Sequence, residues 1–208
     1  MIASVLRLSR SDCKALKITD AYSIHRVVYE LFPGELRNFL FADKGGDFNA
    51  RKILILSDRS PEIPQFGKIE SKPIPDSFLE HDHYGFEVTL NPTKRDKQTG
   101  KTVAIRGREN LLQWLLAKAP SLGFGIKPES LEIRHAGVQT FDLGNGKVVT
   151  HNSASFVGKL QVTDRAKFLN SFRKGIGRAK GFGFGLFQIV PLQNQKPLSR
   201  TIKTRRIK

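Results

Sequence analysis

The sequence predicts an α+β protein made of two consecutive units in which strands and helices alternate. Two patterns carry this prediction. Apolar residues recur at intervals of three and four in some segments, which indicates amphipathic helices, and alternate or run together in others, which indicates strands. Gly and Pro separate these segments. The order of elements in the two halves therefore favours two tandem ferredoxin-like (βαββαβ, RRM-like) domains.

The first half begins with a strand over residues 2–8, where both faces are partly apolar. A helix over residues 20–31 follows a polar stretch, with Asp20 suited to cap it and Pro33-Gly34 ending it. Its apolar stripe consists of Ile24, Val27, Val28 and Leu31. Further strands are expected over residues 36–41, 52–57, 67–70 and 84–90, with a Pro-rich loop between the second and third of these.

The second half repeats the alternation. A strand over residues 102–106 precedes a helix whose stripe is formed by Leu111, Leu112, Leu115, Leu116 and Ala119. Strands over 130–141 and 147–162 are joined by Leu143-Gly-Asn-Gly146, and Asn-Gly is a strong hairpin signal. A last helix begins at Thr163 or Asp164 and ends at Gly175, and a strand over 184–190 follows.

This interpretation divides the chain into three parts. We expect an N-terminal ferredoxin-like domain over residues 1–96 and a C-terminal one over 97–192. Residues 193–208 form a basic tail with six cations and no acid, either a disordered solubilising end or an extra nucleic-acid arm.

The chain carries a large positive charge. Its 35 Lys and Arg residues against 19 Asp and Glu residues give a net charge of +16. Such a field attracts RNA, DNA or an anionic membrane surface. No apolar run approaches the roughly 18 residues of a membrane helix, and Arg7 and Arg10 interrupt any signal-peptide layout. With Cys13 as the one cysteine, no disulfide framework is expected. We expect a cytoplasmic protein with no membrane partner.

A glycine-rich segment, residues 175–185, holds five glycines together with Arg178 and Lys180. Backbone N–H groups beside cations bind phosphate. The glycine spacing matches neither a dinucleotide-binding fingerprint nor a Walker A loop, so a polynucleotide phosphate is favoured. A structural alternative stays open, in which Gly175 ends the helix and the chain turns tightly into a strand.

Tyr22 and His25 lie one turn apart on the helix over residues 20–31, on the side away from its apolar stripe. Imidazole acts as a general acid or base near neutral pH. RNA supplies its own nucleophile, the 2′-OH, so a base, an acid and cations suffice for its cleavage and no metal is needed. In the alternative interpretation both rings only pack against the next element.

The sequence offers no convincing metal or cofactor site. His81-Asp82-His83 is the only local candidate, and it lies in a Pro-rich loop. His135 and His151 are isolated and are expected to be structural or solvent-facing. We therefore expect neither a metal nor a cofactor.

Basic residues gather in three places along the chain, and few acids lie near them. The first group lies around the turn that precedes the strand over 102–106 and continues just past the end of that strand. One cation lies at the Asn-Gly hairpin, and the third group lies within and just before the glycine-rich segment. These residues are Lys94, Arg95, Lys97, Lys101, Arg106 and Arg108; Lys147; and Arg173, Lys174, Arg178 and Lys180. Such repetition favours contact with an RNA backbone, which is mostly recognised by shape and phosphates when it is duplex.

Four motifs follow one another along the chain: Asp20-Ala-Tyr22-Ser-Ile-His25-Arg26, Asn91-Pro-Thr-Lys94-Arg95 with Thr102-Val-Ala-Ile105, the helix over 108–116 with Trp114, and the glycine-rich segment with Leu186. In this order they resemble the CasE family of CRISPR RNA-processing endoribonucleases. The resemblance spans nearly residues 1–192, and the basic tail extends past the usual family end.

The resemblance implies two tandem ferredoxin-like domains and metal-independent cleavage of a repeat stem-loop by 2′-OH attack. A cyclic 2′,3′-phosphate and a 5′-OH would form, and the RNA product would stay bound within a CRISPR effector complex of several subunits. His25 and Tyr22 match the catalytic pair, and the groove-inserting hairpin falls near residues 140–152. RNA-binding residues are expected to be Arg26, Lys94, Arg95, Lys101, Arg106, Lys147, Arg173, Lys174, Gly177, Arg178, Lys180 and Gly181.

Two other functions stay open from the residues alone. A non-catalytic RNA-binding subunit could read RNA through exposed aromatic residues of similar sheets. A basic ribosome-associated protein would fit the charge and the tail but would not explain the face formed by Tyr22 and His25.

Overall fold

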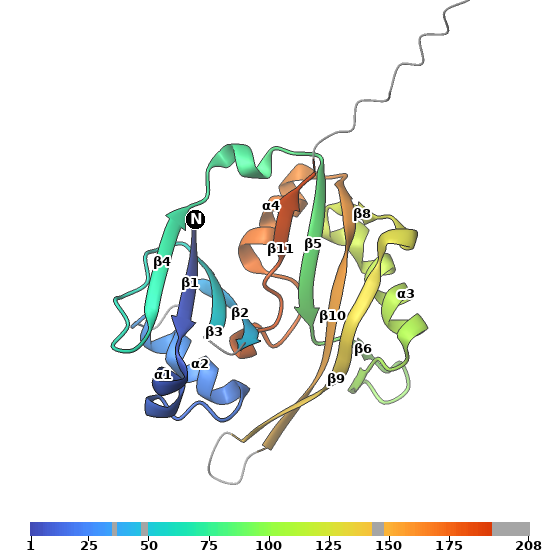
Figure 1. Ribbon diagram of the computed structural model, residues 1–208. Coiled ribbons are helices and arrows are strands. Elements are labelled where there is room, and N and C mark those ends of the chain that lie inside the picture. The colour runs from blue at the N-terminus through green and yellow to red at the C-terminus, as the bar shows by residue number, and fades with distance from the viewer. Residues whose placement is uncertain (35–36, 47–49, 143–147, 193–208) are drawn as a thin grey trace, which may run out of the picture.

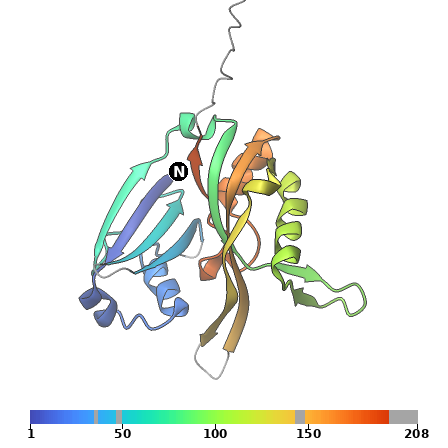
Figure 2. The same cartoon turned by 45° about the vertical axis from the view of Figure 1, so that its right-hand side comes forward.

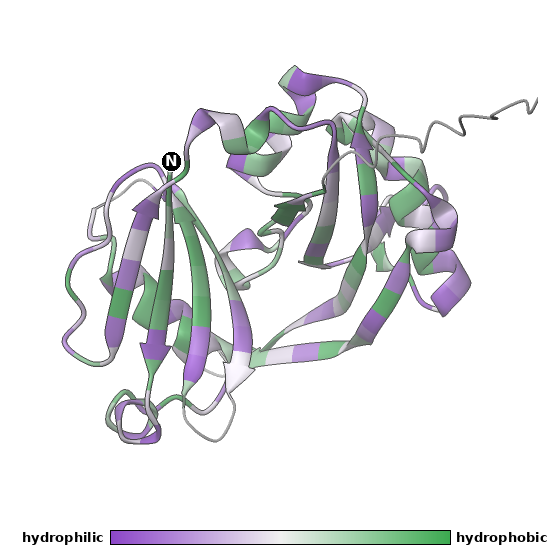
Figure 3. Cartoon of the chain, turned by 45° about the horizontal axis from the view of Figure 1, so that its top comes forward, coloured by the Kyte–Doolittle hydropathy of each residue, from purple (hydrophilic) through white to green (hydrophobic). Residues whose placement is uncertain are grey.

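Two antiparallel sheets, each carrying helices on one face, lie side by side and inclined to each other (Figures 1 and 3). The computed structural model describes residues 1–34, 37–46, 50–142 and 148–192. Within these ranges no helix is long and apolar enough to cross a membrane. The Asn-Gly turn, including Lys147, and the basic tail lie outside the described residues.

The first sheet has the strand order β2-β3-β1-β4, and all its pairs are antiparallel. Its elements are β1 (Ile2–Leu8), α1 (Arg10–Ala15), α2 (Ala21–Glu30), β2 (Phe39–Gly46), β3 (Arg51–Ser57) and β4 (Lys68–Pro73). Alternate residues of β1 and β3, such as Leu6 and Ile53, are buried against Ile24 and Val28 of α2. Helix α1 was not expected; Ser9 caps it by accepting a hydrogen bond from the Asp12 N–H at 3.2 Å.

The second sheet has the order β11-β5-β10-β8, and β9 also pairs with β10. Its elements are β5 (His83–Leu90), α3 (Arg108–Lys118), β8 (Phe124–Ile126), β9 (Glu132–Asp142), β10 (Val148–Val162), α4 (Arg165–Lys174) and β11 (Gln188–Pro191). Short 3-10 turns are η1 (Asp76–Leu79), η2 (Ala119–Leu122), η3 (Pro128–Ser130) and η4 (Lys180–Phe182). Its core is rich in phenylalanine: Phe124, Phe156, Phe168 and Phe187 are each at most 1% exposed.

The pairing of β5 corrects the expected division of the chain at residue 96. Strand β5, expected in the first unit, pairs with β10 and β11 of the second sheet. Its alternation of buried and half-buried residues predicts a strand but does not specify which sheet it joins. The short polar strand β4 completes the first sheet instead. We therefore place the division between Pro73 and His83.

The strand expected over residues 102–106, by contrast, does not join the second sheet. Its counterpart β7 (Thr102–Ala104) pairs with β6 (Thr93–Arg95) to form a separate small hairpin beside α3 (Figure 2). With β5 as its first strand and the three-residue strands β6, β7 and β8 left aside, the second unit retains the order β5-α3-β9-β10-α4-β11, which is the βαββαβ order of a ferredoxin-like domain.

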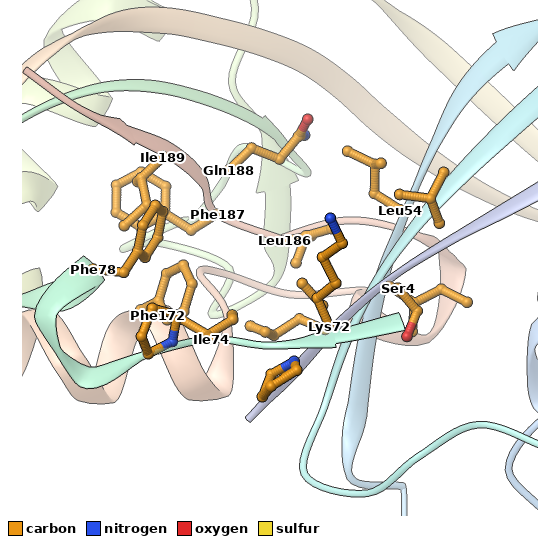
Figure 4. Close-up of a pocket in the computed structure, with 16 residues that line it drawn as sticks. Ser4, Leu54, Lys72, Ile74, Phe78, Phe172, Leu186, Phe187, Gln188 and Ile189 are labelled. Atoms are coloured by element: carbon orange, nitrogen blue, oxygen red, sulfur yellow. The ribbon is translucent and has the colours of Figure 1, made fainter. Parts of the chain in front are cut away.

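The chain segment after the glycine-rich segment packs between the two units. Leu186, Phe187 and Ile189 line an apolar groove of about 310 Å³, and Leu54 of the first sheet lines its other side (Figure 4). Lys44 of β2 also forms an ion pair with Glu87 of β5. These contacts bring the glycine-rich segment, which belongs to the second unit, next to α2 of the first.

Candidate active site

Helix α2 holds Tyr22 and His25 in fixed directions. Asp20 caps the helix by accepting a hydrogen bond from the Ser23 N–H at 2.8 Å, and Ser23 Oγ accepts one from the Asp20 N–H at 3.0 Å. Ile24 and Val28 are buried against the sheet. Since residues three and four apart share a helix face, Tyr22 and His25 are left on the opposite side, as expected from the sequence.

That opposite side is half-buried rather than open to solvent, because η4 packs on it. His25 stacks on Tyr22 with ring centroids 5.4 Å apart and an interplanar angle of 13°. Tyr29 lies 4.0 Å from the His25 ring, and Phe182 of η4 lies 5.5 Å from it. The imidazole is therefore held between aromatic rings from both units of the chain.

A single hydrogen bond determines which nitrogen of His25 carries hydrogen. Nδ1 lies 2.6 Å from the backbone oxygen of Gly181. A carbonyl oxygen only accepts, so Nδ1 donates to it, and the neutral ring keeps Nε2 as its acceptor. A neutral imidazole held in this tautomer is suited to take a proton from a nearby hydroxyl.

The glycine-rich segment can approach α2 closely at Gly181 because this residue lacks a side chain. A Cβ added at Gly181 would lie 3.0 Å from Arg37 Nη1 and 3.3 Å from Tyr29 Oη. Gly185, at φ +84°, would place a Cβ 2.4 Å from the Ile176 oxygen. The Ile176 N–H donates to the Gly185 oxygen at 2.9 Å and closes the segment into a compact loop. Gly175 ends α4, so the expected C-cap is confirmed.

Three cations lie in or beside this loop: Lys180, Lys174 and Arg37. Lys180 Nζ donates to the Lys174 backbone oxygen at 2.7 Å, and Arg37 lies against Gly181. Burial, together with the nearby charges of Arg37 and Lys174, lowers the pKa of Lys180. None of the three pairs with a carboxylate of the described residues. The site is therefore suited to an anionic group. Arg37 was missed in the sequence, where it lies in a segment expected to be an ordinary strand.

The other expected RNA contacts are spread around this centre. Arg26 is exposed on α2, Arg173 is exposed in the last turn of α4, and Gly177 is exposed in the loop. Arg178 Nη1 donates to Thr102 Oγ1 at 3.0 Å and so joins the glycine-rich segment to the β6–β7 hairpin. The remaining expected cations are exposed on or beside that hairpin: Lys94, Arg95, Lys101 and Arg106.

The remaining histidines have different environments. His135 is exposed, whereas His151 is half-buried beside Phe182 and bonded to Asn91 at a cavity of about 510 Å³. Asp82, expected as part of a possible metal motif, forms an ion pair with Arg165 at 2.8 Å. The described residues include no group of three or more His, Cys, Asp or Glu side chains gathered for a metal.

Two known proteins with CRISPR-related names are similar to this chain in sequence. The chain is 28% identical over 120 residues to the CRISPR-associated endoribonuclease Cse3 of Thermus thermophilus, covering 51% of this chain and 54% of that relative. It therefore spans about half the length of that relative. It is 25% identical over 189 residues to the CRISPR system Cascade subunit CasE of Escherichia coli K12, covering 83% of this chain and 93% of the relative.

Solved structures share the fold. Cse3 bound to a 19-nucleotide RNA superposes with a TM-score of 0.80 at 21% identity, covering 92% of this chain and all of that one. Cas6e from Escherichia coli K-12 gives a TM-score of 0.71 at 22% identity over the same share of this chain and all of Cas6e. The architecture is that of tandem ferredoxin-like domains. The family model of CRISPR associated proteins matches residues 1–191, so this chain belongs to that family.

Proposed function

We propose that this protein is an endoribonuclease that cleaves CRISPR repeat stem-loop RNA, keeps the mature RNA bound and works with other subunits of an effector complex in the cytoplasm. The observation that carries the proposal is the His25 ring, held in one tautomer by the Gly181 carbonyl among cations without carboxylate partners in the described chain. One relative named as an endoribonuclease and another named as a Cascade subunit support it.

The reaction uses the nucleophile of the RNA itself. His25 Nε2 takes the proton of the 2′-OH, and the 2′-oxygen attacks the adjacent phosphorus. The bond from phosphorus to the 5′-oxygen breaks, which leaves a cyclic 2′,3′-phosphate on one product and a 5′-OH on the other. Tyr22, stacked parallel to His25, keeps the imidazole plane in position.

Cations stabilise the charge that develops on the phosphorane. Lys180 and Arg37 lie beside Gly181, the residue that holds His25. Preorganised donors of this kind act most strongly where charge grows in the transition state. The lowered pKa of Lys180 also makes its ammonium a better acid, so it is suited to protonate the departing 5′-oxygen. No metal ion is required in this scheme.

RNA binding uses the rest of the basic surface. Arg26, Arg173 and Arg178 bind phosphates close to the cut, and Lys94, Arg95, Lys101 and Arg106 bind phosphates along the β6–β7 hairpin. The long β9–β10 hairpin, which projects from the second sheet in Figures 1 and 2, enters a groove of the stem. Lys147 at its expected turn adds a further charge there.

The decisive experiment mixes the protein with its own organism's repeat RNA in EDTA and analyses the product ends. A cyclic phosphate and a 5′-OH are expected with the wild type, and none with His25→Ala, while His25→Ala still binds the RNA. A 2′-deoxy nucleotide just upstream of the cut should also block cleavage. Unchanged cleavage by His25→Ala contradicts the proposal, and binding without any product by the wild type supports a non-catalytic subunit.

A further inference from the structure

A cavity of about 510 Å³ lies beside the candidate active site, and the Phe182 ring contributes to both. Phe182 lies 5.5 Å from His25 and 5.1 Å from His151, centroid to centroid, and it lines the cavity. The other walls come from the β6–β7 hairpin and its flanking residues, from the β9–β10 hairpin, and from Arg178 and Ala179 of the glycine-rich segment. This volume lies within the range of sites that hold a small molecule or a nucleoside.

Two buried polar atoms at this cavity have no hydrogen-bond partner within the part of the chain that the structure describes. Asn91 is 8% exposed, and its Nδ2 lies 3.1 Å from His151 Nδ1. Because an amide nitrogen only donates, Nδ1 accepts and the hydrogen of the neutral His151 ring lies on Nε2. Asn91 Oδ1 and His151 Nε2 are buried without a hydrogen-bond partner among the described residues. Buried polar atoms are nearly always paired, so these two side chains fit a ligand with its own donor and acceptor once a small rotation turns them toward the cavity they line.

The charge of the lining specifies the ligand further. Arg106 and Arg178 line the cavity, and none of its described lining residues is Asp or Glu. Arg178 is held toward the β6–β7 hairpin by its bond to Thr102. Guanidinium groups bind phosphate, and aromatic side chains such as Phe182 stack on unpaired bases. A nucleotide combines the phosphate, the aromatic face and the polar edge that these groups match.

We infer that this cavity binds one unpaired nucleobase of the RNA, next to the nucleotides that are cut at His25. The base stacks on Phe182, its polar edge meets Asn91 and His151, and its phosphate meets Arg106 and Arg178. The cavity thereby makes cleavage depend on the identity of a base outside the stem. The inference rests on the proposed function for the identity of the RNA, but it concerns binding rather than the chemical step.

The test measures the affinity of the protein for repeat RNAs made non-cleavable by a 2′-deoxy nucleotide upstream of the cut. Each nucleotide flanking the cut is replaced in turn by an abasic one. In the wild type one position should weaken binding by about tenfold, the scale of one base–aromatic stack. Val138→Trp fills the cavity from a side chain that is 58% exposed, and it should reduce that penalty to less than about twofold.

Val148→Trp is the matched control. Val148 lies on the same hairpin and is 60% exposed, but it does not line the cavity. The position-specific penalty should persist in this variant, whatever its overall affinity. His151→Phe tests the polar edge: the wild type should discriminate among the four bases at that position by about tenfold and the variant by less than twofold. Circular dichroism confirms that each variant is folded.

The results separate this inference from the proposed function. If no abasic position stands out in the wild type, or if the penalty survives in Val138→Trp, the cavity does not bind a base, even where natural repeat RNA is cleaved. If the penalty is present and Val138→Trp removes it while natural RNA is never cleaved, the cavity binds a base and the endoribonuclease proposal fails.

Discussion

Three glycines of the glycine-rich segment allow the closure of this loop to be tested by a graded series of alanine substitutions. A Cβ at Gly185 would lie 2.4 Å from the Ile176 backbone oxygen, at φ +84°. Gly177 has a similar φ of +80°, but its Cβ would have room, with Leu90 Cδ2 nearest at 3.8 Å. Gly181 lacks a positive φ of this kind, and its Cβ would meet only the ends of the Arg37 and Tyr29 side chains.

These differences give different losses of folding free energy. Gly177→Ala carries only the strain of a positive φ, about 1–2 kcal/mol. Gly185→Ala adds a backbone clash and disturbs the hydrogen bond from the Ile176 N–H, so its loss should reach about 3 kcal/mol or more. Gly181→Ala should change stability by less than about 0.5 kcal/mol, because side-chain ends can move aside.

Urea unfolding followed by circular dichroism measures the three differences at one temperature and pH. Cleavage measured in parallel should be slower for Gly181→Ala than for the wild type, because Arg37 and Tyr29 must shift away from the site. The packing argument for the loop is refuted if Gly185→Ala is no less stable than Gly177→Ala. It is also refuted if Gly181→Ala proves the least stable of the three.

Three further outcomes are expected. Lys180→Gln should slow single-turnover cleavage by about 10²-fold, the scale of one lost transition-state donor, while RNA affinity measured by filter binding falls much less. Asp20→Ala should lower the free energy of unfolding by about 1 kcal/mol in urea, because the α2 cap is lost. Burial lowers the pKa of His151 below its ordinary value of 6.5, so the unfolded chain binds more protons below that pH and stability falls as the pH falls. Thermal unfolding between pH 7 and pH 5 should therefore depend less on pH in His151→Phe.

Local patterns in the sequence predict local features of this structure well. The apolar stripe of α2, the cap at Asp20 and the helix end at Gly175 each depend on residues within one or two turns, and all three are present. Strand β5 shows where such patterns fail. Its alternation specifies a strand with one buried face, but partner choice depends on packing against Phe168 of α4, about eighty residues later.

The candidate site was predictable in its residue types and less so in its geometry. Tyr22 and His25 could be selected because such rings are unusual on the outer face of an amphipathic helix, and Lys180 because it lies among closely spaced glycines. The bond from His25 to the Gly181 carbonyl joins residues 156 positions apart, and a backbone oxygen carries no signal in the sequence. Arg37 was missed for a related reason, since it becomes part of the site only when the loop folds against α2.

The same geometry implies that neither unit holds the site alone. Helix α2 and its capping belong to the first unit, whereas η4 and the Gly181 carbonyl belong to the second. Their relative position depends on the segment after Gly185, where Leu186 and Phe187 line the groove that Leu54 lines from the first sheet (Figure 4). Packing at that groove therefore acts on His25 from a distance. The orientation of the imidazole depends on how the two sheets are held together as well as on the residues that touch it.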